Sequence, residues 1–239
     1  RYSYADSEAI APYNTMVSNN MIAIPIKEEY FFDNELLTTL NTDYDFAGNN
    51  FILPKEIKSQ KYDNNGSQEE TRLLFNQYDE KGNPLEFQEN DGTPNVMLWG
   101  YNRSLPIAKI VNATYNEVIT NLGNTNYLQS LTDDALEHEL NSKLRVTMPN
   151  SYVSTFIHNP LVGVTQTTDP RNYRQHYVFD DFNRLYLTKD TDGYILSQNL
   201  YEFYDVNTQI KNHTINHVFK TSYLESELNT IEDDDIIKM

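Results

Sequence analysis

The chain has 239 residues, contains no cysteine and carries a formal net charge of −17. The lack of cysteine excludes disulfides, thiolate catalysis and cysteine-ligated zinc. The strong negative charge disfavours nucleic acids and anionic membrane surfaces as partners, because both are bound by basic surfaces. No run of about 18 apolar residues is present, so the sequence predicts no membrane-spanning helix.

Residues 1–20 are polar and carry little pattern, whereas residues 21–111 are typical of β-hairpin repeats. Short apolar or aromatic runs alternate there with clusters of Asp, Asn and Gly, because tight hairpin turns need residues that tolerate positive φ. The first three runs are Met21–Ile26, Glu29–Phe32 and Leu36–Leu40, and turn clusters follow at 33–34, 47–50, 63–66 and 80–83.

We expect helix only in a small central insertion, residues 112–149. The first helix has apolar residues at helical spacing and ends at Gly123. The second begins at Thr132, an N-cap residue followed by two acids that suit the first turn. It stops before Pro149. The apolar faces of the two helices are Tyr115, Val118, Ile119 and Leu122, and then Leu136, Leu140 and Leu144.

Strand patterns return in residues 150–224, at 152–157, 161–165, 173–179, 185–188 and 194–204. We interpret this block as further β-hairpin repeats. Residues 225–239 include four consecutive acids from Glu232 to Asp235 and are expected to form a solvated acidic tail. The predicted fold is therefore mainly β, with stacked antiparallel β-hairpins and a small central two-helix insertion.

One pattern occurs twice, at residues 78–101 and 179–204. Each copy has an aromatic-Asp turn followed, ten residues or so later, by an Asp-Gly turn, and closes on an aromatic run. Weaker copies begin at Tyr44 and Tyr62. A shift of 101 residues superimposes the two strong copies; the predicted turn residues are Tyr78, Asp79, Gly82, Asp91 and Gly92 in the first and Asp180, Asn183, Asp192 and Gly193 in the second.

The repeated residues have a physical use in a strand–turn–strand–turn unit. Aspartate can accept hydrogen bonds from backbone N–H groups of its own turn, and Gly or Asn can occupy the left-handed position. A single hairpin is marginally stable in water, so such units are expected to stack side by side.

These motifs resemble the YD repeat of RHS-type bacterial proteins. The resemblance rests on Tyr-Asp-x-x-Gly-Asn-x-Leu at 78–85, on the run from Gly163 to Leu185, on Trp-Gly-Tyr-Asn at 99–102 and on Leu-Pro-Ile-Ala-Lys-Ile at 105–110. It covers roughly Met21 to Tyr204. The family implies stacked hairpins that form a spiralling sheet or hollow shell, at the cell surface or as a toxin carrier. Asn172 and Asn183 stand where Gly is usual, and no self-cleavage signature is present.

Two patterns suggest metal sites but have simpler interpretations. Asp190-x-Asp192-Gly193 resembles the start of a calcium loop, but Tyr201 stands where the bidentate acid is needed, and a turn already explains the motif. His213 and His217 have zinc-ligand spacing, yet their neighbours favour a strand. We predict no metal site and no bound cofactor.

The sequence predicts no catalytic residues either. It contains no nucleophile elbow and no Gly-rich phosphate loop. Among 35 acidic residues some pair will always have a glycosidase-like separation, so acid pairs carry no weight. Trp99 is a candidate for stacking on a sugar or partner, although its apolar neighbours favour a core position between hairpins.

We therefore expect a non-enzymatic structural or interaction component of a secreted or surface-exposed bacterial YD-repeat protein. The chain starts at Arg1, and we expect a mature or truncated product. An open stack of hairpins leaves sheet edges, so the upstream part of the same protein or another subunit is the expected partner. Outer-membrane or secretion-machinery proteins and carbohydrate are further candidates. The alternatives are a carbohydrate-binding or carbohydrate-active domain and the carrier part of a secreted toxin.

Overall fold

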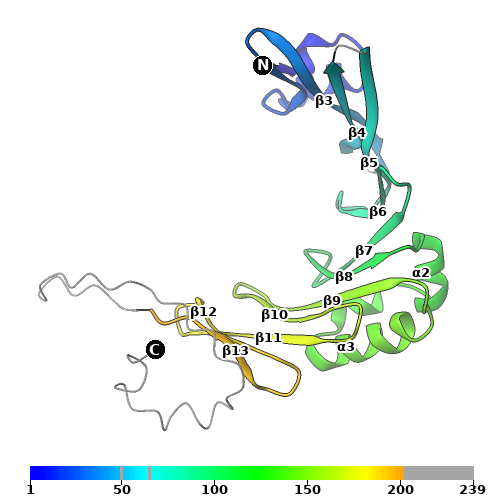
Figure 1. The fold of residues 1–239 in the computed structure, drawn as a ribbon. Coiled ribbons are helices and arrows are strands. Elements are labelled where there is room, and N and C mark those ends of the chain that lie inside the picture. The colour runs from blue at the N-terminus through cyan, green and yellow to red at the C-terminus, as the bar shows by residue number, and fades with distance from the viewer. Residues whose placement is uncertain (49–50, 64–65, 202–239) are drawn as a thin grey trace, which may run out of the picture. The chain divides into compact units, whose positions relative to one another are not determined.

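The computed structural model describes residues 1–48, 51–63 and 66–201 (Figure 1). Within these ranges 13 strands form one open antiparallel sheet, and their order in the sheet is their order in the sequence. The mainly β fold predicted from the sequence is confirmed. The chain divides into two compact units. Within the described residues, unit 1 comprises Arg1–Ser130 and Ser142–Tyr152, and unit 2 comprises Leu131–Asn141 and residues 153–201.

The strands of unit 1 are short at the start and long in the middle. They are β1 (Tyr2–Tyr4), β2 (Pro25–Phe32), β3 (Glu35–Ala47), β4 (Phe51–Asp63), β5 (Gly66–Tyr78), β6 (Pro84–Glu89), β7 (Pro94–Gly100) and β8 (Leu105–Val111). The predicted turn at Asp33-Asn34 is confirmed: both residues have positive φ, 47° and 67°, as a two-residue hairpin turn requires. Phe32 accordingly pairs with Glu35.

The strands of unit 2 form the second block. They are β9 (Tyr152–Asn159), whose first residue belongs to unit 1, β10 (Gly163–Thr168), β11 (Arg174–Phe179), β12 (Leu185–Lys189) and β13 (Ile195–Gln198). The predicted strand at 194–204 is described only as far as residue 201, and the predicted tail 225–239 lies outside the described residues.

The first predicted helix is α2 (Tyr115–Leu122), and it ends at Gly123, where φ is 83°. A capping box fixes its start: the Thr114 hydroxyl oxygen accepts a hydrogen bond from the Glu117 N–H, and the Glu117 carboxylate accepts one from the Thr114 N–H. Val118 and Leu122 are buried, as the helical spacing indicates. A short 3₁₀ helix, η3 (Tyr127–Ser130), follows.

The second predicted helix is also present, as α3 (Asp133–Leu140) continued by a π-helical turn, η4 (Asn141–Arg145). Its three leucines, Leu136, Leu140 and Leu144, are completely buried. Thr132 occupies the N-cap position, but its side chain makes no capping hydrogen bond, unlike Thr114 in the first helix. No helix in the described ranges is long and apolar enough to cross a membrane.

The expectation that helix is confined to residues 112–149 is wrong. Strand β1, a 3₁₀ turn η1 (Ala5–Ser7) and helix α1 (Tyr13–Ser18) lie in the segment that showed little pattern. Met16 is completely buried there, in a small core with Ala5, Ile26 and Ile52. Two of the residues that pack with Met16, Ile26 and Ile52, lie on β2 and β4. A periodic pattern within residues 1–20 therefore cannot predict this core.

The predicted strand Met21–Ile26 is also corrected, because β2 begins only at Pro25. Ile22 and Ile24 are exposed, whereas Met21 and Ile26 at the two ends of the run pack into the core around Met16, so the run does not alternate as a strand. In place of two separate strands at 21–26 and 29–32 the structure has one strand, β2, which begins at Pro25 and pairs with β1 and β3.

A buried carboxylate joins the helix of unit 2 to its sheet. Glu137 of α3 is 4% exposed. Its two carboxylate oxygens accept hydrogen bonds from the hydroxyl of Thr155 on β9 (2.7 Å), the hydroxyl of Thr168 on β10 (2.9 Å) and the side-chain amide of Asn141 (2.8 Å). A buried charge is costly unless it is hydrogen-bonded, so the two threonine donors fix how α3 lies on the strands, and Asn141 at the end of α3 supplies the third hydrogen bond.

Candidate functional site

Four turns of the described chain share one hydrogen-bonded geometry, which we call the Asp corner. The N–H of the first residue, an aspartate, donates to the carbonyl of the fifth at 2.8–2.9 Å, and the N–H of the fourth donates to the carbonyl of the first at 2.9–3.1 Å. The Oδ1 atom of the aspartate accepts from the N–H groups of the third and fifth residues at 2.8–3.0 Å. The corners are 79–83, 169–173, 180–184 and 190–194.

The geometry explains why each corner needs two kinds of residue. The fourth residue has positive φ in every corner: Gly82 85°, Asn172 67°, Asn183 60° and Gly193 88°. Gly and Asn tolerate this left-handed conformation better than other residues. The aspartate satisfies two N–H groups that have no strand partner at the turn, so a single carboxylate closes it.

The second carboxylate oxygen of three corners binds a side chain of the same turn. Oδ2 of Asp79 accepts from the Asn83 amide at 3.0 Å, and Oδ2 of Asp169 and of Asp180 lies 2.9 and 2.6 Å from the guanidiniums of Arg171 and Arg184. The N–H of Tyr173 most strongly lowers the pKa of Asp169, and the hydrogen bond from Arg184 most strongly lowers the pKa of Asp180.

The predicted turn residues of the second copy fall in two corners. Asp180 and Asn183 are the first and fourth residues of one. Gly193 is the fourth residue of another, but its aspartate is Asp190; Asp192 only donates its N–H to Asp190, at 3.0 Å. The calcium-like pattern is therefore a turn, and no three His, Asp or Glu side chains gather to hold a metal in the described ranges.

The first copy contains one corner and one different turn. Asp79 and Gly82 form a corner, and Tyr78 just before it donates its hydroxyl to the Pro54 carbonyl. At Asp91-Gly92 the first position is Glu89, whose carbonyl accepts from the Gly92 N–H at 2.9 Å. There the Asp91 carboxylate accepts from the Thr93 N–H instead, at 2.9 Å. This turn is not an Asp corner.

The weaker copy at Tyr44 does not reproduce the corner. Tyr44 and Asp45 lie inside β3, and Asp45 pairs with Leu53 of β4. Its carboxylate accepts from the neighbouring Phe46 N–H and binds Lys55 at 2.8 Å. The Tyr62 copy runs through residues 64–65, which lie outside the described residues. His213 and His217 also lie outside them.

The β7–β8 loop holds its backbone in an unfavourable conformation. Tyr101, Asn102 and Arg103 are three successive residues with positive φ, 50°, 58° and 59°. The left-handed conformation costs about 1–2 kcal/mol for each such residue, so neighbouring contacts must hold the loop. Gly100 begins it, and a Cβ atom there would lie 2.5 Å from Cγ2 of Ile107, which leaves room only for glycine.

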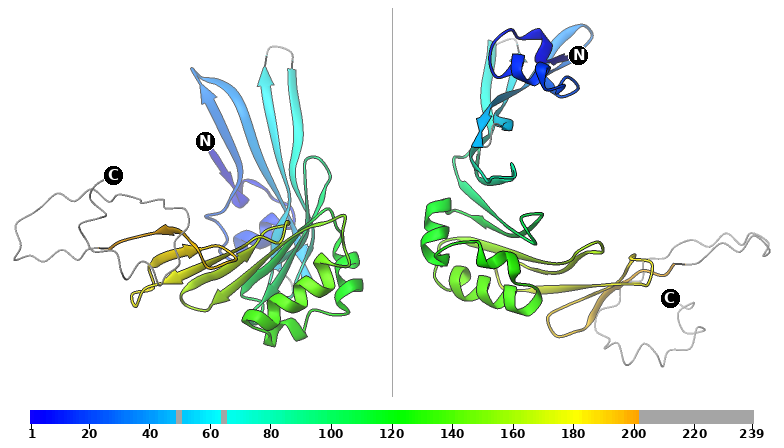
Figure 2. Two further views of the ribbon diagram at one scale, coloured as in Figure 1. Left: turned by 60° about the horizontal axis from the view of Figure 1, so that its bottom comes forward. Right: turned by 180° about the vertical axis from the view of Figure 1, so that it is seen from behind.

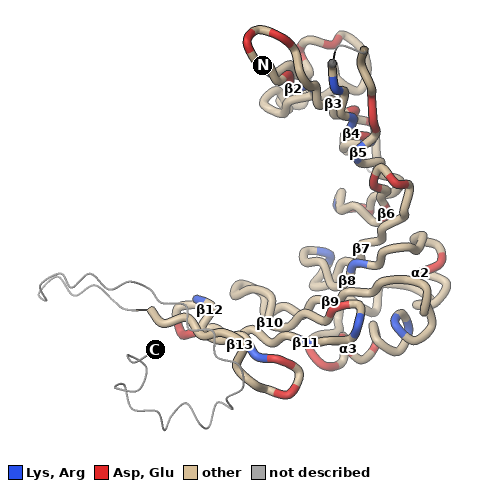
Figure 3. The backbone as a smooth tube through the Cα atoms, in the orientation of Figure 1, with Lys and Arg blue, Asp and Glu red and all other residues tan. Residues whose placement is uncertain are grey.

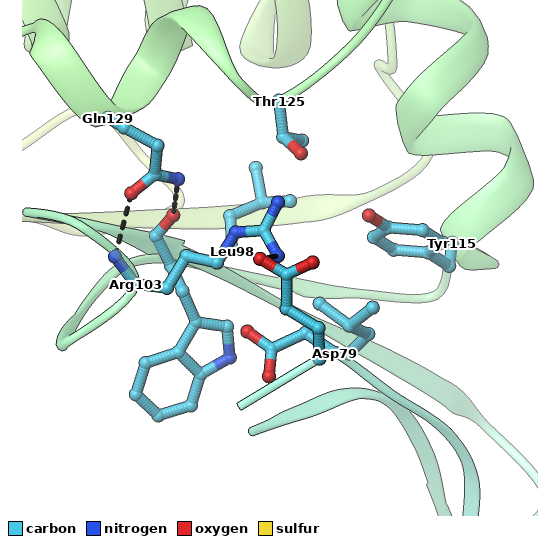
Figure 4. Close-up of a pocket in the computed structure, with 9 residues that line it drawn as sticks. Asp79, Leu98, Arg103, Tyr115, Thr125 and Gln129 are labelled. Carbon is cyan, nitrogen blue, oxygen red and sulfur yellow. Dashed lines mark hydrogen bonds and ion pairs between the residues drawn. The ribbon is translucent and has the colours of Figure 1, made fainter. Parts of the chain in front are cut away.

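Figure 4 shows the side chain that holds the loop from the helical side. Gln129 of η3 accepts from the Arg103 N–H at 2.8 Å and donates to the Trp99 carbonyl at 2.6 Å. On the other side, Asn83 of the first Asp corner donates to the Arg103 carbonyl at 2.9 Å, and Lys81 donates to the Asn102 carbonyl. The loop is thus fixed between an Asp corner and η3.

Trp99 lies beside a hollow of about 150 Å³ that is also lined by Asp79, Leu98, Arg103 and Tyr115. The ring is half-buried, and its indole N–H donates to the Pro84 carbonyl at 2.9 Å. The guanidinium of Arg103 is bound as well, by Glu80 at 2.7 Å and Asn126 at 3.1 Å. The polar groups around the hollow therefore hold the loop in place.

Sequence reasoning missed most of this arrangement. The Trp-Gly-Tyr-Asn run is a recognisable motif, but Gln129 and Arg103 belong to none, and three consecutive left-handed residues without glycine carry no sequence signal. Only Gly100 could have pointed to this loop from the sequence, because its close approach to Ile107 excludes any side chain.

Removing the carboxylate of the first corner should destabilise the fold. Asp79→Ala leaves the N–H groups of Lys81 and Asn83 without their acceptor, so we expect the free energy of unfolding in urea to fall by about 1–2 kcal/mol. Asp79→Asn keeps one side-chain oxygen and should lose less. Equal stability of wild type and Asp79→Ala would contradict the role given to the corner.

The corners should also make the fold sensitive to acid. The pKa of Asp180 is lowered in the folded state, so its contribution is complete above the ordinary aspartate pKa of about 3.9 and disappears as the pH falls through the lowered value. We expect the unfolding free energy of wild type to decline on acidification more steeply than that of Asp180→Asn. Asp181→Asn is the control, because it removes one negative charge at the neighbouring residue. Its unfolding free energy should decline on acidification as steeply as that of wild type.

Loss of the Gln129 contacts should release the strained loop. Gln129→Ala removes two hydrogen bonds to the loop, so trypsin should cleave after Arg103 about tenfold faster or more than in wild type. Thr125→Ala changes another side chain beside the same hollow and should leave the cleavage rate unchanged. Equal rates in both variants would show that Gln129 does not hold the loop.

The comparisons with known proteins leave the family open. No protein-family model matches the chain, and no curated protein matches it. Among solved structures, the crystal structure titled TcdB2-TccC3-TEV aligns with a TM-score of 0.40 and 9% sequence identity. The alignment covers 79% of this chain and 10% of the other, so the chain spans about a tenth of that protein's length. A similarity at this level carries no argument about function.

Proposed function

We propose that this chain is a non-enzymatic structural and interaction component of a secreted or surface-exposed YD-repeat (RHS-type) protein. The observation that carries the proposal is the Asp corner. Four aspartates of the described chain accept backbone hydrogen bonds within their own turns, where they shape the hairpins. Their carboxylates serve the architecture, which is the role that a β scaffold needs.

Other polar side chains support the same role. Buried Glu137 accepts two hydrogen bonds that join α3 to β9 and β10 and a third from Asn141 at the end of α3. Both the oxygen and the nitrogen of the Gln129 side-chain amide bind the β7–β8 loop. An enzyme would instead aim such groups at a substrate pocket. Trp99, the candidate for carbohydrate stacking, is half-buried and donates its N–H to the Pro84 carbonyl, so its polar group also serves the fold.

The two ends of the strand order are the places where a partner is expected. In the described residues these are β1, with three residues, and β13, with four. Edge strands present backbone groups that another chain can pair with. We propose that the upstream part of the same protein or another subunit covers one of these edges, at the bacterial surface or during secretion.

Cross-linking of the intact parent polypeptide or its native complex tests this proposal. Lys27 lies on β2 beside β1, and Lys189 on β12 beside β13; Lys109 on β8 serves as an internal control. We expect an amine-reactive cross-linker to join Lys27 or Lys189, but not Lys109, to residues outside this chain.

A screen for hydrolysis of glycosides, esters, phosphoesters and peptides tests the non-enzymatic part of the proposal. Turnover that one Asp or Glu substitution abolishes would overturn the non-enzymatic role.

A further inference from the structure

The end of the β2–β3 hairpin exposes an unusual amount of apolar surface. Tyr30 is 50% exposed, Phe31 46%, Phe32 67% and Leu37 45%. We call these four residues the hairpin wedge. Single exposed apolar side chains are common on proteins, but several large ones gathered at one hairpin end indicate a site of interaction.

The wedge is apolar on both sides of the hairpin. Tyr30 and Phe32 point to one face because successive strand residues alternate, and Phe31, which pairs with Leu36, points to the other. In the described chain β3 pairs with β4 only from Thr38 onward, so Glu35 and Leu36 pair within their own hairpin, where the register passes over Leu37. The left view of Figure 2 shows the β2–β3 hairpin extending alongside β4 and β5. A two-sided apolar tip fits a recess better than a flat surface.

The charge of the same hairpin selects among partners. Residues 25–40 carry one lysine against four acids, a formal net charge of −3, and Figure 3 marks the acids along the hairpin. Glu29 is bound by Lys27 at 3.0 Å and by Arg1 at 3.6 Å. Asp33 and Glu35 flank the apolar tip and are exposed. A complementary partner is therefore basic at its rim.

Three other occupants are disfavoured by the same charge. A second copy would bring two acidic hairpins together. Residues 202–239 of this chain hold eight acids against three lysines, so they would also repel the wedge. An anionic lipid surface repels it as well.

We propose that the hairpin wedge inserts into an apolar recess, rimmed by Lys or Arg, on a protein partner. This inference rests on the proposed function, since it names the contact by which the scaffold holds a partner. Aromatic side chains at such a contact carry a large share of the binding free energy. The acidic residues around them speed and orient the encounter.

Two synthetic peptides of opposite charge test the proposal with the full 239-residue chain. One alternates Leu with Lys and the other alternates Leu with Glu, and each carries a fluorescent label for anisotropy. We expect the Leu-Lys peptide to bind, the Leu-Glu peptide not to bind, and salt to weaken the complex. The double variant Phe31→Ser with Phe32→Ser should bind the Leu-Lys peptide about tenfold more weakly or worse.

The double variant keeps every charge, so the comparison isolates the apolar part of the contact. Leu161→Ser is the control, because Leu161 is a fully exposed apolar residue on another loop; it should bind as wild type does. Circular dichroism confirms that each variant is folded. Equal binding by wild type and the double variant would overturn the proposal.

Two further measurements separate the rival occupants. Self-association of wild type in sedimentation that the double variant loses would assign the wedge to a second copy. Binding to phosphatidylcholine vesicles that the double variant loses would assign it to a membrane, and either result overturns the proposal. Substrate turnover, by contrast, would remove the proposed function and leave the peptide result standing.

Discussion

One aspartate oxygen that accepts two backbone hydrogen bonds is the interaction on which the described structure depends. A tight turn leaves N–H groups that no neighbouring strand can reach, and the Asp corner satisfies them with the side chain of the turn's own first residue. Each corner is therefore self-contained, needs only Asp first and Gly or Asn fourth, and can recur wherever the sequence supplies them. The corners join β5 to β6 and each pair of successive strands from β10 to β13, so in these parts of the sheet each strand lies next to the one before it in the sequence.

The first Asp corner also helps to position the β7–β8 loop. Asn83 and Lys81 of the first corner hold the carbonyls of the β7–β8 loop, while Gln129 holds its N–H and the Trp99 carbonyl from η3. Three left-handed residues persist because contacts from two sides fix them. In unit 2, Glu137 serves a similar purpose with three hydrogen bonds beneath α3. The polar chemistry of the described chain is thus largely committed to its shape, which is the basis for proposing a scaffold.

The sequence predicts features that are set locally. Hairpin turns, the helix ending at Gly123 and the face of Leu136 and Leu140 all follow from spacing within one element. It places Asp192 in a turn but does not single out Asp190, whose carboxylate accepts the backbone hydrogen bonds there, because an Asp-Gly pair is a stronger local turn signal than an aspartate three residues before the glycine. It cannot find the core around Met16 or the contacts of Gln129, since their partners lie far away in the sequence. Exposed aromatics on a strand look like core residues until the structure shows which face is uncovered.

The proposed scaffold role stands on the claim that the aspartate side chain, and not the backbone alone, closes each corner. Amide hydrogen exchange at Phe182 and Arg184, measured by NMR in wild type and in Asp180→Ala, tests that claim most directly. If the carboxylate holds both N–H groups, the two amides exchange together and about tenfold faster or more in the variant. Unchanged exchange at both amides would show that the turn forms without the carboxylate and would contradict the account.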